Sequence, residues 1–304
     1  MVVTAVIPLF NKQDTISRAA QSCAHQRGLD GGIIVVDDGS TDRSVAVLKE
    51  LGLDEVRIVL QENAGPGAAR NTGVRHASST FVAFLDADDE WRPGFLEAAV
   101  AALRQYPEAI GYVCGYDSGE YRAQRPNKVR ELNKPRGAVP PPYDADGETL
   151  KKHVDALHSS CIVVRKSRFE DAGGFYSDNG CRYGEDSWIW SRLLLSGPFI
   201  WDEKEFVRFH VEDSELGFAV TSRRSARPIT LESDQWHSYL PTAAKDAGER
   251  LSKYYAQLDY NILMRSLSWR QARRVRRRHE LKRRLGWLKE VWACLRAARE
   301  RMIR

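Results

Sequence analysis

Phe81-Val82-Ala83-Phe84-Leu85-Asp86-Ala87-Asp88-Asp89-Glu90-Trp91 is the stretch of sequence that decides the fold of this chain. It starts as an apolar run, which predicts a buried strand, and then ends in a group of carboxylates. Like charges at this spacing repel one another, so a cation is their natural neutraliser. Hard cations such as Mg²⁺ or Mn²⁺ prefer carboxylate oxygens together with the phosphates of a substrate. The stretch therefore predicts a metal and diphosphate site at the carboxyl end of a sheet.

The composition is that of an ordinary globular protein. With 304 residues, 42% hydrophobic and 29% charged, the chain is long enough to bury a large core and shows no bias toward disorder. Its five cysteines form no C-x-x-C pair and are odd in number, which disfavours a disulfide framework or zinc ribbon and favours a reducing cytosol. The apolar start breaks at Pro8, so we expect a strand there rather than a signal peptide, and no apolar run approaches the ~20 residues of a membrane span.

Strands alternate with helices through the first third of the chain. Apolar, β-branched runs predict strands at residues 2–9, 33–36, 56–60 and 81–85. Capping residues and apolar periodicity predict helices between them, ending near residues 24, 51, 76 and 105. This rhythm is typical of a doubly wound α/β sheet, whose ligand crevice lies outside the carboxyl ends of its strands. Asp38, which follows the second strand, is therefore expected to face the same crevice as Asp86 and Asp88.

The second half of the chain is less regular. Residues 117–150 are rich in Pro and Gly and lose periodicity, so we expect a long binding loop there. Strand signals return at residues 161–164 and 206–210, and a helix is expected from Gly184 to Leu193 with acids in its first turn. Residues 221–304 are expected to form a helical extension to a catalytic domain at residues 1–220.

The motifs, taken together, resemble one enzyme family. They are Val6-Ile7-Pro8-Leu9-Phe10-Asn11-Lys12, Val36-Asp37-Asp38-Gly39-Ser40-Thr41-Asp42, Asn63-Ala64-Gly65-Pro66-Gly67-Ala68-Ala69-Arg70-Asn71, Phe84-Leu85-Asp86-Ala87-Asp88-Asp89 and Gly184-Glu185-Asp186. In order and spacing they are similar to those of the family 2 inverting glycosyltransferases, over roughly residues 2–212. The resemblance implies a GT-A type fold, with a mixed, mostly parallel sheet flanked by helices, followed here by the C-terminal helical extension.

The resemblance also implies roles for single residues. Those placed against the nucleotide base, typically uracil, are Pro8, Phe10, Asp38 and Arg70. Asp86 would lie near the ribose, and Asp88 would ligate the Mn²⁺ or Mg²⁺ that bridges the diphosphate. On sequence alone, Phe10 either stacks on the base or closes the core, and Arg70 either adds positive charge or pairs with an acid.

Two acids compete for the role of general base. An inverting transfer needs a carboxylate that accepts the proton of the acceptor hydroxyl on the face opposite the leaving nucleoside diphosphate. Asp186 matches the family's general base, while its neighbour Glu185 stays open as an alternative because proton-transfer geometry decides between them. His210 lies in a segment that resembles the family's late Arg-x-His motif, which implies a metal or phosphate contact. The expected partners are a nucleotide-sugar donor and a glycan or lipid-linked acceptor, and the loop at residues 117–150 is a candidate acceptor loop.

The charge is concentrated at the C-terminus. Residues 269–304 hold 14 Arg and Lys against 3 Glu, a net charge of +11, whereas residues 1–268 carry −6. An apolar stripe at helical spacing runs through this tail: Leu281, Leu285, Leu288, Trp292 and Leu295. A solvated charged helix, a nucleic-acid-binding arm and a membrane-surface helix are all open readings, and tryptophans among leucines and cations favour the third. We therefore expect peripheral association at the cytoplasmic face of the cell membrane.

The sequence thus predicts a metal-dependent inverting glycosyltransferase, and the resemblance implies that its donor is a UDP-sugar. A sugar nucleotidyltransferase is the first alternative. Such an enzyme is expected to carry a glycine-rich basic loop directly after the first strand, where this chain has Pro8-Leu9-Phe10-Asn11. A nucleic-acid-binding protein that uses the basic tail is the second, and we consider it the weaker. The donor sugar, the acceptor and the linkage depend on loop shape, which the sequence does not reveal.

Overall fold

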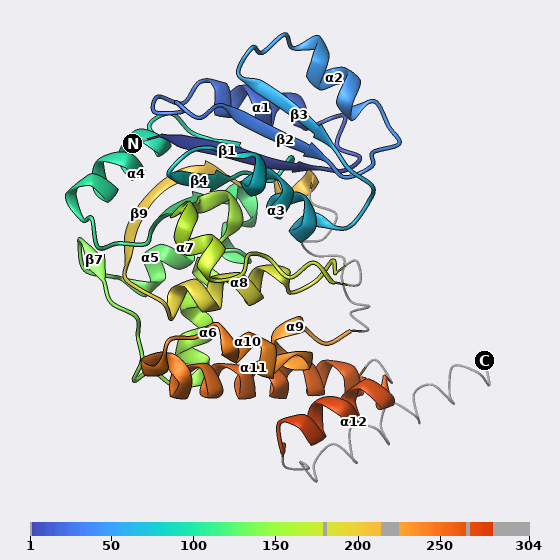
Figure 1. The fold of residues 1–304 in the computed structure, drawn as a ribbon, viewed down its shortest axis with the longest axis vertical. Helices are drawn as coiled ribbons and strands as arrows, with labels where there is room; N and C mark the ends of the chain where they lie inside the picture. The colour runs from blue at the N-terminus through green and yellow to red at the C-terminus, as the bar shows by residue number, and fades with distance from the viewer. Residues whose placement is uncertain (1, 179–180, 214–224, 266–267, 282–304) are drawn as a thin grey trace.

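A nine-stranded mixed sheet forms the centre of the computed structural model, which describes residues 2–178, 181–213, 225–265 and 268–281 (Figure 1). The first four strands and helices alternate as expected from the sequence. The strands are β1 (Val3–Leu9), β2 (Ile33–Asp37), β3 (Val56–Leu60) and β4 (Phe81–Phe84). The helices are α1 (Ile16–Ala24), α2 (Ser44–Glu50), α3 (Pro66–His76) and α4 (Phe95–Gln105).

The strand order explains why the acids converge. The sheet runs β3-β2-β1-β4-β8-β6-β9-β5, with β7 paired to β9. The strands β3, β2, β1 and β4 are parallel neighbours, and Leu9 of β1 lies opposite Asp37 of β2. Parallel strands end at the same edge of a sheet, so the residues that follow β1, β2 and β4 meet there. Beyond β4 the sheet is mixed, because β8 (Ile162–Arg165) is antiparallel to both β4 and β6 (Gly111–Asp117).

The helix α3 packs closely on β1 and β2 because it carries a glycine at the contact. Gly73 faces Val6, and a Cβ atom at this position would lie 2.3 Å from the Val6 Cγ1 atom. This close approach fixes the position of Arg70, one turn earlier on the same helix.

The segment expected to be one long loop contains short regular elements. They are η1 (Gly119–Ala123), α5 (Lys128–Leu132), β7 (Ala138–Val139) and α6 (Gly147–Ala156). The Asn127 side chain accepts a hydrogen bond from the Arg130 backbone at the start of α5, and Asp146 does the same for Thr149 at the start of α6. The first three elements span two to five residues each, which is too short to leave an apolar period in the sequence.

The last strand is longer than the sequence suggests. β9 runs over Phe199–Arg208, whereas the expected strand began only at residue 206 and extended to His210. Its middle, from Asp202 to Glu205, consists of charged residues, which the strand tolerates because their side chains are partly or largely exposed. The charged run therefore hides the strand from a search for apolar alternation. Two shorter elements complete the sheet region and its surroundings: β5 (Glu90–Trp91) and α7 (Lys166–Asp171).

The described part of the C-terminal extension packs against the rest of the protein. Its helices are α9 (Pro228–Leu231), α10 (Ser233–Ser238), α11 (Lys245–Arg265) and α12 (Trp269–Arg278). The short 3-10 turn η4 (Val211–Asp213) precedes the extension, and a second one, η5 (Thr242–Ala244), lies between α10 and α11. Figure 1 shows α11 running below α6 and α8 (Glu185–Leu194). The Trp236 indole donates a hydrogen bond of 3.0 Å to the backbone of Trp188, so α10 is tied to α8.

The basic tail is only partly described. In α12, Ala272 and Val275 are buried against α11, so the apolar side of this helix is already used inside the protein. Residues 282–304, which hold most of the expected apolar stripe, lie outside the described residues. A search of the described helices finds none that is both long enough and apolar enough to cross a bilayer.

We predict that Gly73→Ala destabilises the protein. In an open helix the change would gain about 1 kcal/mol, but here the new methyl group overlaps Val6 and should cost about 1–3 kcal/mol. Urea unfolding measures the difference. In the double variant Val6→Ala/Gly73→Ala the overlap is relieved, so its cost should be clearly smaller than the sum of the two single costs; simple additivity would contradict this packing.

Candidate active site

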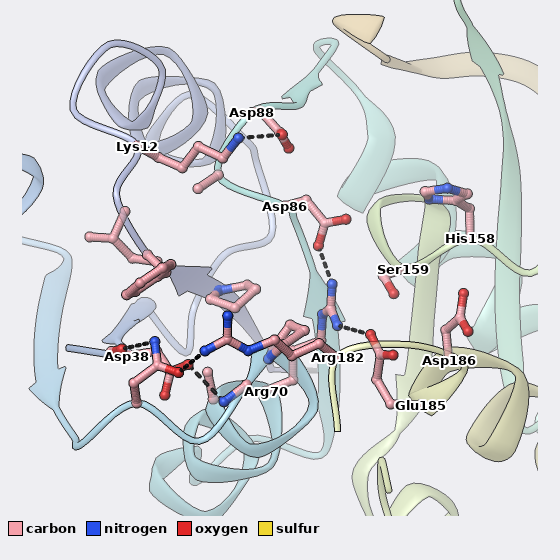
Figure 2. Close-up of a pocket in the computed structure, with 18 residues that line it drawn as sticks. Lys12, Asp38, Arg70, Asp86, Asp88, His158, Ser159, Arg182, Glu185 and Asp186 are labelled. Atoms are coloured by element: carbon pink, nitrogen blue, oxygen red, sulfur yellow. Dashed lines mark hydrogen bonds and ion pairs between the residues drawn. The ribbon is translucent and has the colours of Figure 1, made fainter. Parts of the chain in front are cut away.

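A cavity of about 330 Å³ opens where the carboxyl ends of β1, β2 and β4 meet the first turns of α3 and α8 (Figure 2). Most of the residues predicted from the sequence line it: Pro8, Phe10, Asp38, Arg70, Asp86, Asp88, Glu185 and Asp186. Figure 2 shows Asp38 and Asp186 on opposite sides of the cavity, with Asp86 between them. The structure therefore brings these residues together, while the individual roles assigned to them stay predictions.

Asp38 organises the wall nearest β2 and β3. Its carboxylate accepts hydrogen bonds from Gln61 Nε2 at 2.7 Å, from the Ala64 backbone at 2.8 Å and from the Gly65 backbone at 2.9 Å. Gly65 has a φ of 94°, and a Cβ atom there would lie 2.6 Å from the Cys181 carbonyl oxygen. Asp38 is buried, and its contacts hold the loop that leads into α3.

Arg70 is the buried cation at the centre of the cavity. Its Nη2 atom lies 2.5 Å from Asp86 Oδ1, and its Nη1 atom lies 3.6 Å from Glu185 Oε1. Burial by itself would raise the pKa of Asp86, but the charge and hydrogen bond of Arg70, together with the nearby His158 and Lys12, outweigh it and lower the pKa. Of the two readings left open by the sequence, Arg70 thus pairs with an acid.

The pairing does not use up the guanidinium. Arg70 Nε and Nη1 are buried and find no hydrogen-bond acceptor among the described residues. A buried donor without a partner costs about 1–3 kcal/mol, so an anionic ligand that accepts from it gains that much. Phe10 is 38% exposed at the rim of the same cavity, which shows that it does not close the core.

Asp88 already holds a cationic group. Lys12 Nζ lies 3.1 Å from Asp88 Oδ2 and also donates to the Asp213 carbonyl oxygen at 3.1 Å. Burial and the charge of Asp86 raise the pKa of Asp88, against the opposing effect of Lys12. The Asp88 carboxylate is thus repelled by Asp86 and already pairs with an ammonium group. Carboxylate oxygens of this kind are the ligands that a hard divalent cation prefers. Lys12 lies in the first of the sequence motifs, and the sequence alone assigns no role to it.

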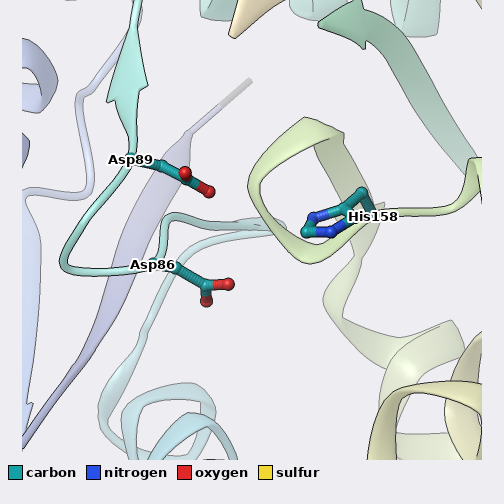
Figure 3. A group of neighbouring side chains, drawn as sticks. All are labelled: Asp86, Asp89 and His158. Carbon is teal, nitrogen blue, oxygen red and sulfur yellow. The ribbon is translucent and has the colours of Figure 1, made fainter. Parts of the chain in front are cut away.

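A group of possible metal ligands that does not include Asp88 lies nearby (Figure 3). Oxygen and nitrogen atoms of Asp86, Asp89 and His158 lie within 4.8 Å of one another. Asp89 accepts a hydrogen bond of 2.5 Å from Ser160, and burial together with the charges of Asp86 and Asp88 raises its pKa. Burial lowers the pKa of His158 to about 4, despite the nearby Asp86. Asp89 is therefore a buried acid that lies against Asp86 and His158.

His210 does not line the cavity. Its ring nitrogens lie 3.2 Å from Glu90 and 3.3 Å from Glu212, and it forms with Glu212 and Asp213 another group within 4.8 Å. The link to Asp88 runs through Lys12, which contacts both Asp88 and the Asp213 backbone. The predicted metal or phosphate contact of His210 stays a prediction.

The two candidate bases differ in their surroundings. Both follow Gly184, whose φ of 82° turns the chain into α8. Glu185 is buried beside Arg70, and burial together with Asp186 raises its pKa to about 7 against the effect of Arg70. Asp186 is exposed and lines both this cavity and an adjoining one.

Sequence reasoning missed the residues that reach the site by long-range packing. His158 and Ser160 belong to η2 (Ser159–Cys161) and its flank, and they meet Asp86 and Asp89 only because β8 pairs with β4. Arg182 enters the cavity from the segment before α8, where its guanidinium lies 6.0 Å from the centre of the Phe10 ring. No local motif marks these residues. Lys12 had a signal, because it follows the first strand directly within the quoted motif.

Comparison with known proteins identifies the family. The family model described as "Glycosyl transferase family 2" matches residues 4–173, which is more than half of the chain. The chain belongs to glycosyl transferase family 2. The matched range contains the acids after β2 and β4, Lys12 and Arg70, and ends before Glu185 and Asp186.

Curated relatives match over part of their length. The chain is 32% identical over 181 residues to the succinoglycan biosynthesis protein ExoW of Rhizobium meliloti, covering 55% of this chain and 56% of that protein. It is 33% identical over 200 residues to the uncharacterized glycosyltransferase EpsJ of Bacillus subtilis, covering 61% of this chain and 54% of the relative. The chain thus spans little more than half the length of these two relatives.

Solved structures share the fold. The mannosyltransferase PcManGT from Pyrobaculum calidifontis, solved with GDP-Man and Mn²⁺, gives a TM-score of 0.57 at 19% identity and covers 96% of this chain and 79% of its own. S. aureus TarS 1–349 in complex with UDP-GlcNAc gives 0.55 at 16% identity, covering 88% and 72%. At these identities the likeness shows the fold, which is of the GT-A type.

We predict that Glu185→Gln changes how stability depends on pH. Between pH 5 and pH 7 folded Glu185 keeps its proton while the unfolded chain has lost it, so this group makes the wild type less stable as pH rises. The shift from 4.5 to about 7 is worth roughly 3 kcal/mol at most, and the variant lacks it.

Chemical denaturation at pH 5 and pH 8 measures this effect. From pH 5 to pH 8 the free energy of unfolding of the wild type should fall by on the order of 2 kcal/mol more than that of Glu185→Gln. The exposed Glu55→Gln serves as the control and should follow the wild type. Parallel curves for wild type and Glu185→Gln would show that Glu185 does not titrate in this range.

Proposed function

We propose that this protein is an inverting glycosyltransferase that moves a sugar from a nucleotide-sugar, a UDP-sugar in our reading, to a hydroxyl of a glycan or lipid-linked acceptor. The observation that carries the proposal is the cavity itself: a buried Arg70 with unused donors, Asp88 beside a cation, and a carboxylate on the far wall. Family membership and the UDP-GlcNAc complex of a protein with the same fold support it.

The donor would lie along the wall formed by β1, β2 and α3. Pro8, Phe10 and Asp38 would contact the base, with Phe10 exposed for stacking. Asp86 would contact the ribose. Arg70 donates from Nε and Nη1, which have no other acceptor among the described residues, and would hold the negative charge of the donor in place.

A divalent metal is proposed at Asp88, whose carboxylate oxygens are the kind of ligand that Mg²⁺ and Mn²⁺ prefer. Asp88 and His210 are the proposed ligands, and the pairing of Asp88 with the Lys12 ammonium supports a cationic partner for this carboxylate. When bound, Mg²⁺ or Mn²⁺ would stabilise the charge that develops on the departing diphosphate. The Mn²⁺ complex of PcManGT is compatible with this choice of metal.

Asp186 is the proposed general base. The acceptor hydroxyl oxygen forms a bond to the anomeric carbon, its proton passes to the Asp186 carboxylate, and the bond from that carbon to the diphosphate oxygen breaks. Attack from the side opposite the leaving group inverts the anomeric centre. Glu185 stays the alternative base, because its raised pKa also suits proton transfer, but it lies 3.6 Å from Arg70 and does not line the adjoining cavity as Asp186 does.

We predict that Asp186→Asn and Asp88→Asn fail in different ways. In Asp186→Asn the base is lost, so transfer should fall at least 100-fold while affinity for the nucleotide changes less than about threefold. In Asp88→Asn the metal-dependent hydrolysis of the nucleotide-sugar should be lost as well, because the leaving group is no longer stabilised.

A panel of nucleotide-sugars, assayed with Mn²⁺, with Mg²⁺ and with EDTA, measures both effects. Asp54→Asn, an exposed acid far from the motifs, is the matched control and should behave as wild type. Unchanged metal-dependent turnover in Asp88→Asn would refute its role. Equal losses of nucleotide affinity and transfer in Asp186→Asn would remove that residue from the base role.

We also propose that the basic C-terminal segment attaches the protein peripherally to the inner face of the cell membrane. The described arginines of α12 support this: Arg270, Arg273, Arg274 and Arg277 are exposed, while Ala272 and Val275 face the protein. Each such arginine near an anionic lipid surface contributes about 1 kcal/mol.

We predict that Arg270→Gln/Arg273→Gln/Arg277→Gln weakens binding to vesicles of phosphatidylcholine with 30% phosphatidylserine by roughly 10- to 100-fold. High salt should weaken wild-type binding similarly. The control changes exposed arginines elsewhere: Arg57, Arg75 and Arg104. Equal binding by both triple variants, or tighter binding of wild type to duplex DNA than to vesicles, would overturn the membrane proposal.

A further inference from the structure

A second cavity of about 410 Å³ adjoins the first on the side of the proposed base. The two cavities share Asp186 and His158. Its walls come from the segment at residues 116–128, the end of α6, the start of α8 and the C-terminal extension. A molecule in this cavity can therefore reach Asp186 from the side away from β1, β2 and α3, where the donor is proposed to lie.

One side of this cavity carries an excess of positive charge. Lys128 and Lys151 share a single carboxylate, with Asp155 Oδ2 lying 3.4 Å from Lys128 Nζ and 2.5 Å from Lys151 Nζ. Arg125 lines the same wall. Each ammonium group has three donors, so one shared carboxylate does not satisfy both lysines.

Arg227 contributes shape rather than charge. It pairs with Asp259, which also accepts hydrogen bonds from the Arg227 backbone and from Thr230. Its guanidinium lies 5.1 Å from the centre of the Tyr183 ring and 5.0 Å from the centre of the Tyr255 ring. This neutralised cation fixes the aromatic part of the wall and ties the C-terminal extension to the cavity.

The remaining walls are aromatic and contain unused polar atoms. Tyr116 and Phe209 stack with ring centres 4.3 Å apart, and Trp190 lines the floor. Trp190 Nε1 and His158 Nδ1 are buried without a hydrogen-bond partner in the described part of the chain. Aromatic faces with a few polar groups are typical of sites that bind an organic ligand.

We propose that this second cavity binds the acceptor, and that the acceptor is a glycan with an anionic group, a carboxylate or a phosphate, close to the hydroxyl that receives the sugar. The proposal rests on the proposed glycosyltransferase function and names its acceptor class. The anionic group lies against Lys128 and Lys151, where it supplies the second negative charge that balances the two ammonium groups, since Asp155 supplies only one. The sugar ring lies between the aromatic wall and Asp186.

A purely structural role for the two lysines makes a different prediction. In that case Asp155 only joins α5 to α6, and removing Lys128, Lys151 or Asp155 should lower the affinity for the anionic probes. If the lysines bind an anion, removal of Asp155 instead strengthens binding, because it releases both ammonium groups. Lys151→Gln and Asp155→Asn therefore shift affinity in opposite directions only if the electrostatic account holds.

The experiment measures binding of small probes to the full chain with UDP saturating the first cavity. Tryptophan fluorescence and saturation-transfer NMR report binding of methyl glucuronide, glucose 1-phosphate and methyl glucoside. Both anionic probes should bind at least fivefold more tightly than the neutral glucoside, and the stronger of the two identifies carboxylate or phosphate as the natural group. High salt should remove the advantage.

The variants separate charge from structure. Lys151→Gln should weaken the anionic probes about fivefold or more and leave the glucoside unchanged, whereas Asp155→Asn should tighten them. Lys152→Gln is the matched control, since Lys152 is the next residue on α6, is 64% exposed and pairs with Glu148 outside the cavity. It should stay within twofold of wild type.

Several results would overturn the proposal. These are equal affinity for charged and neutral probes, no binding of either anionic probe at millimolar concentration, or losses of the same sign in Lys151→Gln and Asp155→Asn. UDP affinity is measured in the same samples. Normal UDP binding with any of these results refutes only the acceptor class, whereas loss of UDP binding by the wild type counts against the proposed function itself.

Discussion

The buried contact between Arg70 and Asp86 is the interaction on which the rest of the site depends. It joins α3 to the end of β4, and the same guanidinium lies near Glu185 at the start of α8. Breaking a buried ion pair by removing one partner typically costs 3–5 kcal/mol, because the remaining charge is left without compensation. Gly73, on the same helix as Arg70, lets α3 approach β1 closely, and the Arg70 cation lies among several carboxylates that share one small volume. Without this cation the acids of the cavity would repel one another and shift toward their protonated forms.

The first half of the fold could be predicted because its signals are local. The strands at Ile33–Asp37 and Phe81–Phe84 are continuous apolar runs, and each is followed directly by acids. Alternation with helices then implies a parallel arrangement, which brings Asp38 and Asp86 to one edge. That reasoning needs no knowledge of side-chain packing, so the set of residues that lines the first cavity was largely expected.

The remainder depends on contacts between distant segments. His158 reaches Asp86 through the antiparallel pairing of β8 with β4, and no spacing in the sequence encodes that meeting. The helices α5 and α6 are short and capped by single residues, Asn127 and Asp146, so the segment that carries Lys128 and Lys151 looked like an irregular loop. The second cavity, which these helices help to form, was for that reason beyond sequence reasoning.

We propose that Asp88 marks the metal position beside a nucleoside diphosphate held by Arg70. A crystal soaked with UDP and Mn²⁺, measured at the manganese absorption edge, tests it most directly. The account predicts one anomalous peak next to the Asp88 carboxylate, in contact with the diphosphate, with uracil against Phe10 and Asp38. A peak within the group of Asp86, Asp89 and His158, or a nucleotide bound outside the first cavity, would contradict it.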